Sequence, residues 1–244
     1  MPKIIFKDDS IFVIDKPAFM PAVSLNEGEK NTLASWILAK FPDQAKMGLL
    51  DAGLVHRLDN GTSGVIVAAR STDAYKNLRA QFDSNVVQKK YTALIVGDPP
   101  AEGVIDTPIA HHPRKKNKMV ACNNKKQINE WSARAARTLY RVKERYFFLE
   151  GGIKKTRYAL LEVAIETGVR HQVRVHLASI GFPVAGDTLY QNPKIRSQDL
   201  LKMERYFLHA SEISFAHPAS HEQIGFSSPM PKNLTDYILK LFSW

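Results

Sequence analysis

The feature that most constrains the fold is the apolar run VIVAA at residues 65–69, which directly follows the polar stretch HRLDNGTSG at residues 56–64. A short apolar run rich in β-branched residues is typical of a strand buried on both faces. Asn60 and Gly61 tolerate positive φ, and Asp59 can accept hydrogen bonds from the backbone after it. The sequence therefore predicts a turn that places Asp59 at the edge of a buried strand, where rigid scaffolds often hold functional side chains.

Strand and helix patterns are mixed along the rest of the chain. Thr32, and Ser71 or Thr72, are suited to cap the first two helices. No linker rich in Ser, Gly or Pro divides the chain, so we expect one α+β domain over residues 1–244, built around a largely antiparallel sheet. The expected strands lie within residues 4–6, 11–14, 64–69, 91–96, 131–165 and 207–215, and the expected helices within 33–41, 72–82, 170–180 and 234–241.

The charge balance favours a polyanionic partner. The chain has 34 Lys and Arg against 24 Asp and Glu, a formal charge of +10. Such a surplus is typical of proteins that bind RNA or DNA, although a basic enzyme with small substrates would look the same. Cys122 is the single cysteine, and residues 1–17 show neither a signal peptide nor a membrane anchor. We expect a cytoplasmic protein with no membrane association.

Residues 111–126 form the most basic segment, with no acidic residue and almost no apolar periodicity. We therefore expect a loop. Its basic side chains could bind an RNA backbone or could simply be solvated, and the overall charge favours contact with RNA. These side chains are Arg114, Lys115, Lys116, Lys118, Lys125 and Lys126.

Several motifs in order resemble those of one family. GLVHRLDNGTSGVIVAAR around Asp59 is similar to the signature of the RluA/RluD-type family of pseudouridine synthases. The resemblance spans most of the chain, through IFVIDKP at residues 11–17, KYTA at 90–93, TGVRHQVRVHLASIGFPVAGDTLY at 167–190, and FLHASEISFAHP and FSSP nearer the end. It implies the pseudouridine synthase fold, with flanking helices and loops and a central catalytic cleft.

This chain departs from the family pattern in two loops. Where the family usually has Gly shortly after Lys-Pro, the chain has Ala18 and Phe19. Where the family usually has Thr-Gly-Arg before the His-Gln pair, the chain has an additional residue, Val169, between Gly168 and Arg170. Neither departure touches the residues to which the resemblance assigns the chemistry. No residues before position 1 could hold the S4 RNA-binding module of many relatives, so we expect recognition to rest on the catalytic domain.

The resemblance implies roles for individual residues. Asp59 falls on the family's catalytic aspartate, Tyr91 on its active-site tyrosine, and Arg174 on the arginine that could hold the carboxylate ionised. Arg170, four residues earlier on the expected helix, could reach the same cleft or a phosphate, or be solvated. Arg57 either pairs with Asp59 or faces RNA, where it would assist extrusion of the target base. His56 and Thr62-Ser63-Gly64 are expected to shape the loop.

The implied activity is the isomerisation of uridine to pseudouridine in ribosomal RNA, transfer RNA or both. The isomerisation adds no group and no electron to the substrate, so no cofactor or metal is expected. Asp59 could act as nucleophile or as base. A metal-dependent hydrolase is disfavoured because no acidic ligand lies near His111-His112 or near His171 and His176. A non-catalytic RNA-binding or chaperone protein is the alternative, and we expect a monomer in either case.

Overall fold

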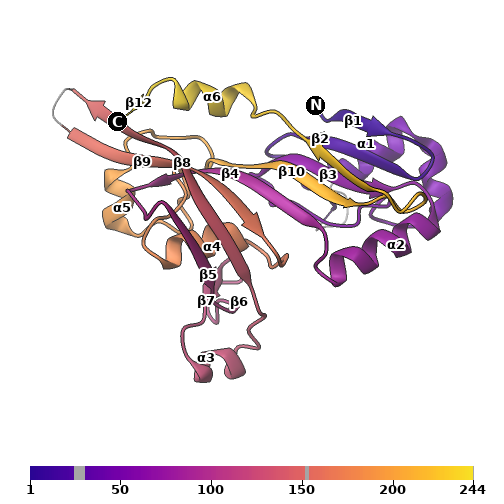
Figure 1. Ribbon diagram of the computed structural model, residues 1–244, viewed down its shortest axis with the longest axis horizontal. Coiled ribbons are helices and arrows are strands. Elements are labelled where there is room, and N and C mark those ends of the chain that lie inside the picture. Colours follow the sequence, from indigo (N-terminus) through magenta and orange to yellow (C-terminus); the bar gives the residue numbers. More distant parts are fainter. Residues whose placement is uncertain (25–30, 152–153, 244) are drawn as a thin grey trace. The chain divides into compact units, whose positions relative to one another are not determined.

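The computed structural model describes residues 1–24, 31–151 and 154–243, which form two compact units (Figure 1). The first unit contains residues 1–89 and 209–230, and the second contains residues 90–208 and 231–244. Each unit has its own strands and buried side chains. A single domain over residues 1–244 therefore stays a prediction.

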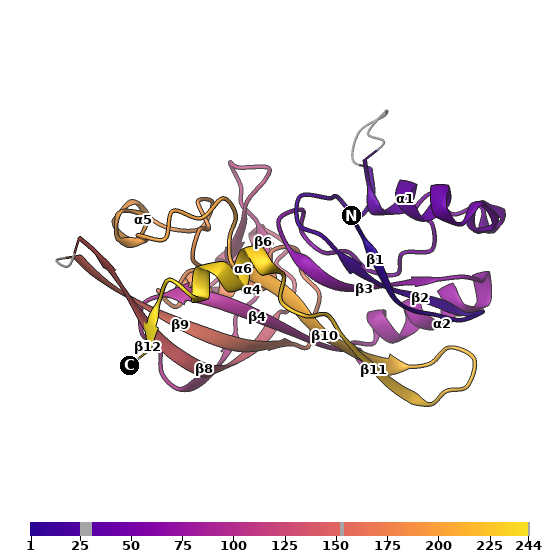
Figure 2. The ribbon, with the colours of Figure 1, turned by 90° about the horizontal axis from the view of Figure 1, so that it is seen from above.

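The first unit is built around the predicted buried strand, β3 (Ser63–Ala69), in which every residue is buried. The opening hairpin β1 (Lys3–Lys7) and β2 (Ile11–Lys16) lies on one side of it, with β2 antiparallel to β3. On the other side, β10 (Leu208–Ala216) runs parallel to β3 and pairs with β11 (Gln223–Ser227) (Figure 2). The other strand pairs of the first unit are antiparallel, so this parallel pair makes the unit's strand arrangement mixed.

Two helices of the first unit begin where the sequence predicts. Helix α1 (Leu33–Lys40) starts with a capping box at Thr32 and is followed by the 3-10 helix η1 (Pro42–Met47). Helix α2 (Thr72–Asp83) is capped by Ser71, whose side chain accepts the Ala74 N–H. Leu78 of α2 packs into the same core as Val65 and Val67, so the predicted amphipathic face is confirmed.

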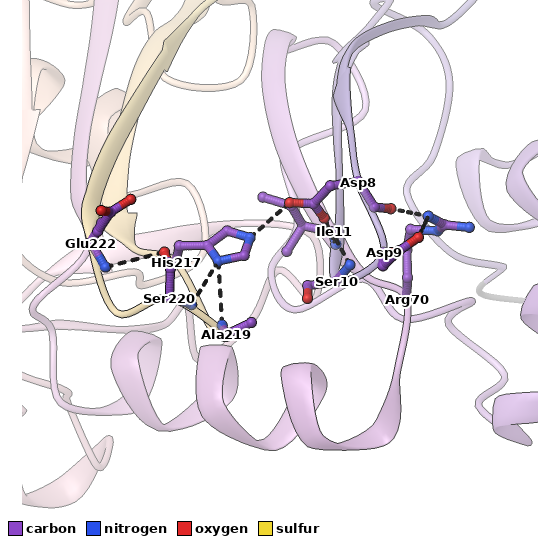
Figure 3. A network of polar contacts seen from close by, with 9 residues as sticks. All are labelled: Asp8, Asp9, Ser10, Ile11, Arg70, His217, Ala219, Ser220 and Glu222. Carbon is purple, nitrogen blue, oxygen red and sulfur yellow. Dashed lines mark hydrogen bonds and ion pairs between the residues drawn. The ribbon is translucent and has the colours of Figure 1, made fainter.

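A polar network fixes the far end of β3 (Figure 3). Asp8, in the β1–β2 turn, accepts the Ser10 and Ile11 N–H groups at 2.7 and 2.8 Å. His217, at the β10–β11 turn, donates from Nε2 to Asp8 at 2.8 Å. Arg70 donates to the Asp8 carbonyl and lies over the Phe12 ring. The Asp8 carboxylate, the Arg70 guanidinium and the His217 ring thus connect three segments where β3 ends.

The second unit has strands in the order β4-β9-β8-β12, in which β9 and β12 both run antiparallel to β8. The expected strand-rich stretch from 131 to 165 is largely the long hairpin β8–β9, and β5 and β12 both pair with β8. These strands are β4 (Gln88–Val96), β5 (Glu102–Asp106), β8 (Arg137–Glu150), β9 (Lys154–Ile165) and β12 (Phe242–Ser243).

Three helices of the second unit are α4 (Gln172–Ser179), α5 (Pro193–Gln198) and α6 (Lys232–Ile238). The helix expected over 170–180 begins two residues late, because His171 has a φ of 57° and cannot continue a right-handed helix. The prediction that Arg170 lies on a helical face with Arg174 is therefore wrong. Arg170 is an exposed residue of the preceding turn.

The basic segment 111–126 is not simply the expected loop. It contains the second strand of the hairpin β6 (Ile109–His111) and β7 (Met119–Ala121), and it leads into helix α3 (Lys125–Glu130), capped by Asn124. Strands of three residues are too short to show a periodic pattern, which explains the error. No helix among the described residues is long and apolar enough to cross a membrane.

Candidate active site

Asp59 lies in a hydrogen-bonded turn directly before β3. The Thr62 N–H donates to the Asp59 carbonyl at 2.9 Å, which closes the turn predicted from Asn60 and Gly61. The Phe19 N–H donates to the Asn60 carbonyl at 2.7 Å, so the loop after β2 supports the tip of the turn. Asp59 is partly exposed.

His56 anchors the start of the turn. Its Nε2 accepts the Val67 N–H of β3 at 3.0 Å, and its ring stacks on Phe82 with centroids 4.6 Å apart. Burial, and then the charge of Lys89, lower the pKa of His56 to about 3. His56 is therefore neutral at physiological pH and shapes the loop, as expected from the sequence.

Ser63 and Gly64 anchor the other end of the turn on β10. The Ser63 hydroxyl lies 3.0 Å from His209 Nδ1, and His209 Nε2 lies 2.9 Å from the Ser228 carbonyl. A carbonyl only accepts, so Nε2 carries the proton and Nδ1 accepts from Ser63. Sequence analysis missed His209, a histidine buried in a strand, because its partner Ser63 is 146 residues away.

Gly64 allows β3 to approach β10 closely. Its φ is 122°, and a Cβ at this position would stand 2.1 Å from the Ala210 carbonyl oxygen. A side chain is therefore excluded by the neighbouring backbone and by the residue's own conformation. Ser63 and Gly64, the small residues of the motif, thus fix the turn to the neighbouring strand β10.

Arg57 is exposed, and its side chain makes no hydrogen bond or ion pair within residues 1–24, 31–151 and 154–243. Of the two arrangements expected for it, pairing with Asp59 is therefore not observed. The outward-pointing arrangement leaves its guanidinium accessible to an anion.

Arg174 belongs to the second unit, where it forms a buried two-point ion pair with Asp187. Nε and Nη2 donate to the two carboxylate oxygens at 2.7 and 2.9 Å. The guanidinium carbon also lies 3.9 Å from the centre of the Tyr206 ring and 5.1 Å from that of Tyr190. The pair uses two of the five guanidinium N–H donors, and these contacts leave the side chain a single orientation.

Hydrogen bonds of Gln172 and His176 hold helix α4 against neighbouring segments. Of the two residues, only His176 was considered as a metal ligand from the sequence. Gln172 accepts the Val169 N–H and donates to the Arg137 carbonyl. His176 contacts the Thr138 hydroxyl through Nδ1 and the Thr107 carbonyl through Nε2, both at 2.8 Å. Burial lowers the pKa of His176. Among the described residues, no three His, Cys, Asp or Glu side chains gather closely enough to hold a metal ion.

The remaining predicted residues also lie in the second unit. Tyr91 is partly buried on β4. Lys118 differs from the other basic residues of its segment: its ammonium lies 5.3 Å from the centre of the Tyr190 ring, and burial lowers its pKa. Three residues at the hairpin tip and two in the first turn of α3 are exposed, namely Arg114, Lys115, Lys116, Lys125 and Lys126.

Comparison with known proteins defines the class of this fold and site. The family model described as RNA pseudouridylate synthase matches residues 10–179, which include the Asp59 turn, β4 and α4. The chain belongs to this family, and the resemblance found in the sequence is confirmed.

Individual relatives agree with this assignment. The chain is 35% identical to ribosomal large subunit pseudouridine synthase D of Nitrosomonas europaea over 95% of its own length and 63% of the relative's. It is 38% identical to an RNA pseudouridine synthase of Chloroflexus aurantiacus, covering 90% and 63% of the two chains. This chain thus spans about 63% of the length of these relatives.

Solved structures show the same fold. Human RNA pseudouridylate synthase domain containing 1 superposes with a TM-score of 0.74 at 22% identity, covering 100% of this chain and 89% of the other. Human RNA pseudouridylate synthase domain containing 4 gives a TM-score of 0.69 at 25% identity, with coverages of 98% and 94%. The expected α+β pseudouridine synthase fold is confirmed.

Proposed function

We propose that this protein converts uridine to pseudouridine in RNA, with Asp59 as the catalytic carboxylate. The observation that carries the proposal is the Asp59 turn: the family motif folds into a turn closed at 2.9 Å and anchored on both sides to β3 and β10. A carboxylate held this firmly and still accessible is suited to repeated covalent or acid–base chemistry.

The reaction balances without an added reagent. The bond from N1 of the base to the ribose breaks, the base rotates, and the ribose carbon bonds to C5. The C5 proton is lost and N1 gains one, so the product is an isomer. Asp59 serves either as a nucleophile toward the ribose or the base, or as the base that removes a proton to start an elimination. Neither route needs a metal or a redox cofactor.

Tyr91 and Arg174 are proposed as the other two catalytic residues. Tyr91 would stack on the target uracil and offer its hydroxyl for proton transfer. Arg174 would supply the cation that keeps the catalytic carboxylate ionised in a site shielded from water. Its fixed orientation against Asp187 supports this role, since a guanidinium that is already ordered loses little entropy when it binds a second anion.

RNA recognition is assigned to the basic side chains. A uridine in folded RNA must leave its stack to be isomerised, and Arg57 is placed on the Asp59 turn to fill the gap or bind the adjacent phosphate. The hairpin β6–β7, helix α3 and Arg170 would bind the RNA backbone and add affinity that depends on salt. The relatives named for the ribosomal large subunit favour ribosomal RNA over transfer RNA as the substrate. The protein would act in the cytoplasm as a monomer.

The test is a map of pseudouridine in total RNA from cells lacking the gene. We expect pseudouridine to disappear from specific sites, and the wild-type gene to restore it. Asp59→Asn should restore none, whereas the control Asp73→Asn, which alters an exposed aspartate in the first turn of α2, should restore all. An unchanged map in the deletion strain, or full restoration by Asp59→Asn, would contradict the proposal. RNA binding without any such loss would instead favour the non-catalytic alternative.

A further inference from the structure

Phe19 combines two unfavourable features. Its φ is 62°, in the left-handed region that glycine adopts freely and a bulky side chain adopts at a cost in conformational energy. The residue is 57% exposed, which leaves an aromatic ring in contact with water. Residues kept in such a conformation are concentrated at functional sites, where another requirement outweighs the cost.

The loop that carries Phe19 is ordered by buried contacts. Lys16, which is fully buried, donates from its ammonium to the Pro17 and Met20 carbonyls at 2.8 and 2.9 Å. Pro17 and Pro21 further restrict the backbone on either side of Phe19. The ring is therefore presented by a rigid loop and is not merely a mobile side chain at the surface.

The same loop is bonded to the proposed catalytic turn. The Phe19 N–H donates to the carbonyl of Asn60, the residue that follows Asp59, at 2.7 Å. Within the described parts of the chain, no other aromatic ring stacks on Phe19 and no Lys or Arg lies over its ring. By contrast, Phe12 stacks on Phe41 and Phe82 stacks on His56. An accessible aromatic face is thus fixed to the backbone of the Asp59 turn.

We propose that Phe19 binds RNA by stacking on an unpaired base that flanks the target uridine. This inference rests on the proposed function. Every nucleobase has an apolar face that stacks on aromatic rings, and sequence-specific or single-stranded RNA binding relies widely on such contacts. The net charge of +10 and the exposed Arg57 on the same turn also fit a polyanion. One exposed ring offers far less area than a stable protein interface needs.

Phe19→Gly separates a binding role from a structural one. It removes the ring and relieves the backbone, so we expect Tm to stay unchanged or to rise by about 2–4 °C. The Kd for RNA should rise roughly 5- to 100-fold, as expected for the loss of one stacked base. The probe is a set of unmodified transcripts of large-subunit ribosomal RNA fragments, with filter binding measured for each in the Asp59→Asn background to prevent turnover.

Matched substitutions test whether the aromatic face matters. Phe19→Trp should keep the wild-type Kd within about threefold, whereas Phe19→Leu should lose most of the affinity lost by Phe19→Gly. Phe242 is 54% exposed and stacked on Phe147 of the same protein, so Phe242→Leu should leave the Kd unchanged. A second readout is the additional tryptophan fluorescence of Phe19→Trp, which stacking on a base should quench.

The outcomes distinguish this inference from the proposed function. If the wild-type protein forms pseudouridine and Asp59→Asn does not, an unchanged Kd in Phe19→Gly overturns the inference alone. A large loss of Tm in that variant, or a change only in self-association, also overturns it. If the wild-type protein forms no pseudouridine, the proposed function fails whatever the Kd values are.

Discussion

The two ends of β3 are stabilised in different ways. At the Arg70 end, charged side chains take part in the hydrogen bonds. The Asp8 carboxylate accepts from the backbone of its own turn and from the His217 ring, and Arg70 donates to the Asp8 carbonyl (Figure 3). At the Asp59 end, the anchors described above are neutral: the uncharged His56 ring, the Ser63 hydroxyl and the backbone of Gly64. The charges of the HRLD segment are therefore displayed at the turn, while uncharged groups hold the turn in place.

The largest expected effect concerns the close approach of β3 and β10. Gly64→Ala should lower the free energy of unfolding by roughly 3–5 kcal/mol, because the added Cβ meets the Ala210 carbonyl and the φ of 122° is strained. Gly48→Ala is the matched control: its φ is 66° but nothing lies within 4 Å, so it should cost about 1 kcal/mol. Denaturant titration measures both, and equal losses would show that the Asp59 end does not depend on this contact.

His56 gives the Asp59 end a specific pH dependence. Its pKa is about 3 in the folded protein and near 6.5 when unfolded, so below pH 6.5 only the unfolded chain takes up the proton. Stability from this residue is complete above pH 6.5 and is lost as the pH falls toward 3. Between pH 7.5 and 5.5, the wild-type protein should lose about 1.4 kcal/mol more than His56→Gln, which keeps an acceptor for Val67. Parallel pH profiles for the two proteins would contradict a neutral His56 in the folded protein.

The smallest effect compares the arginines at the two ends. Arg70→Gln should cost about 1 kcal/mol, because Arg70 contacts the Asp8 carbonyl and the Phe12 ring, and it should leave RNA affinity unchanged. Arg57→Gln should change stability by less than about 0.5 kcal/mol and weaken RNA binding. Thermal unfolding and filter binding on the same samples measure both properties. If the two substitutions have the same profile, the division of roles between the ends is wrong.

Much of the fold could be predicted because the signals are local. The VIVAA run, the Asn60-Gly61 turn and the caps at Thr32 and Ser71 each lie within a few residues of the structure they specify. The short hairpin β6–β7 could not be predicted, since strands of three residues show no period. The start of α4 was misplaced because a positive φ at a histidine has no pattern in the sequence.

The candidate site could be predicted only in part, because several of its contacts join residues that lie far apart in the sequence. The motif around Asp59 identified the turn, but a group that anchors the site comes from far along the chain, since His209 is 146 residues from its partner Ser63. The same holds at the other end of β3, where His217 is 209 residues from Asp8. Asp187, the partner of Arg174, was not distinguished from other acidic residues by spacing or composition. Such pairs are set by tertiary packing, which local patterns do not encode.

We propose that Asp59 performs the chemistry and that other groups hold it in place. The most direct measurement is a single-turnover assay with Asp59→Asn and the wild-type protein on one RNA at saturating protein, with the Kd determined in parallel. We predict no detectable pseudouridine with Asp59→Asn, together with a Kd within about threefold of wild type and an unchanged Tm. Pseudouridine formation at the wild-type rate by Asp59→Asn would contradict the account.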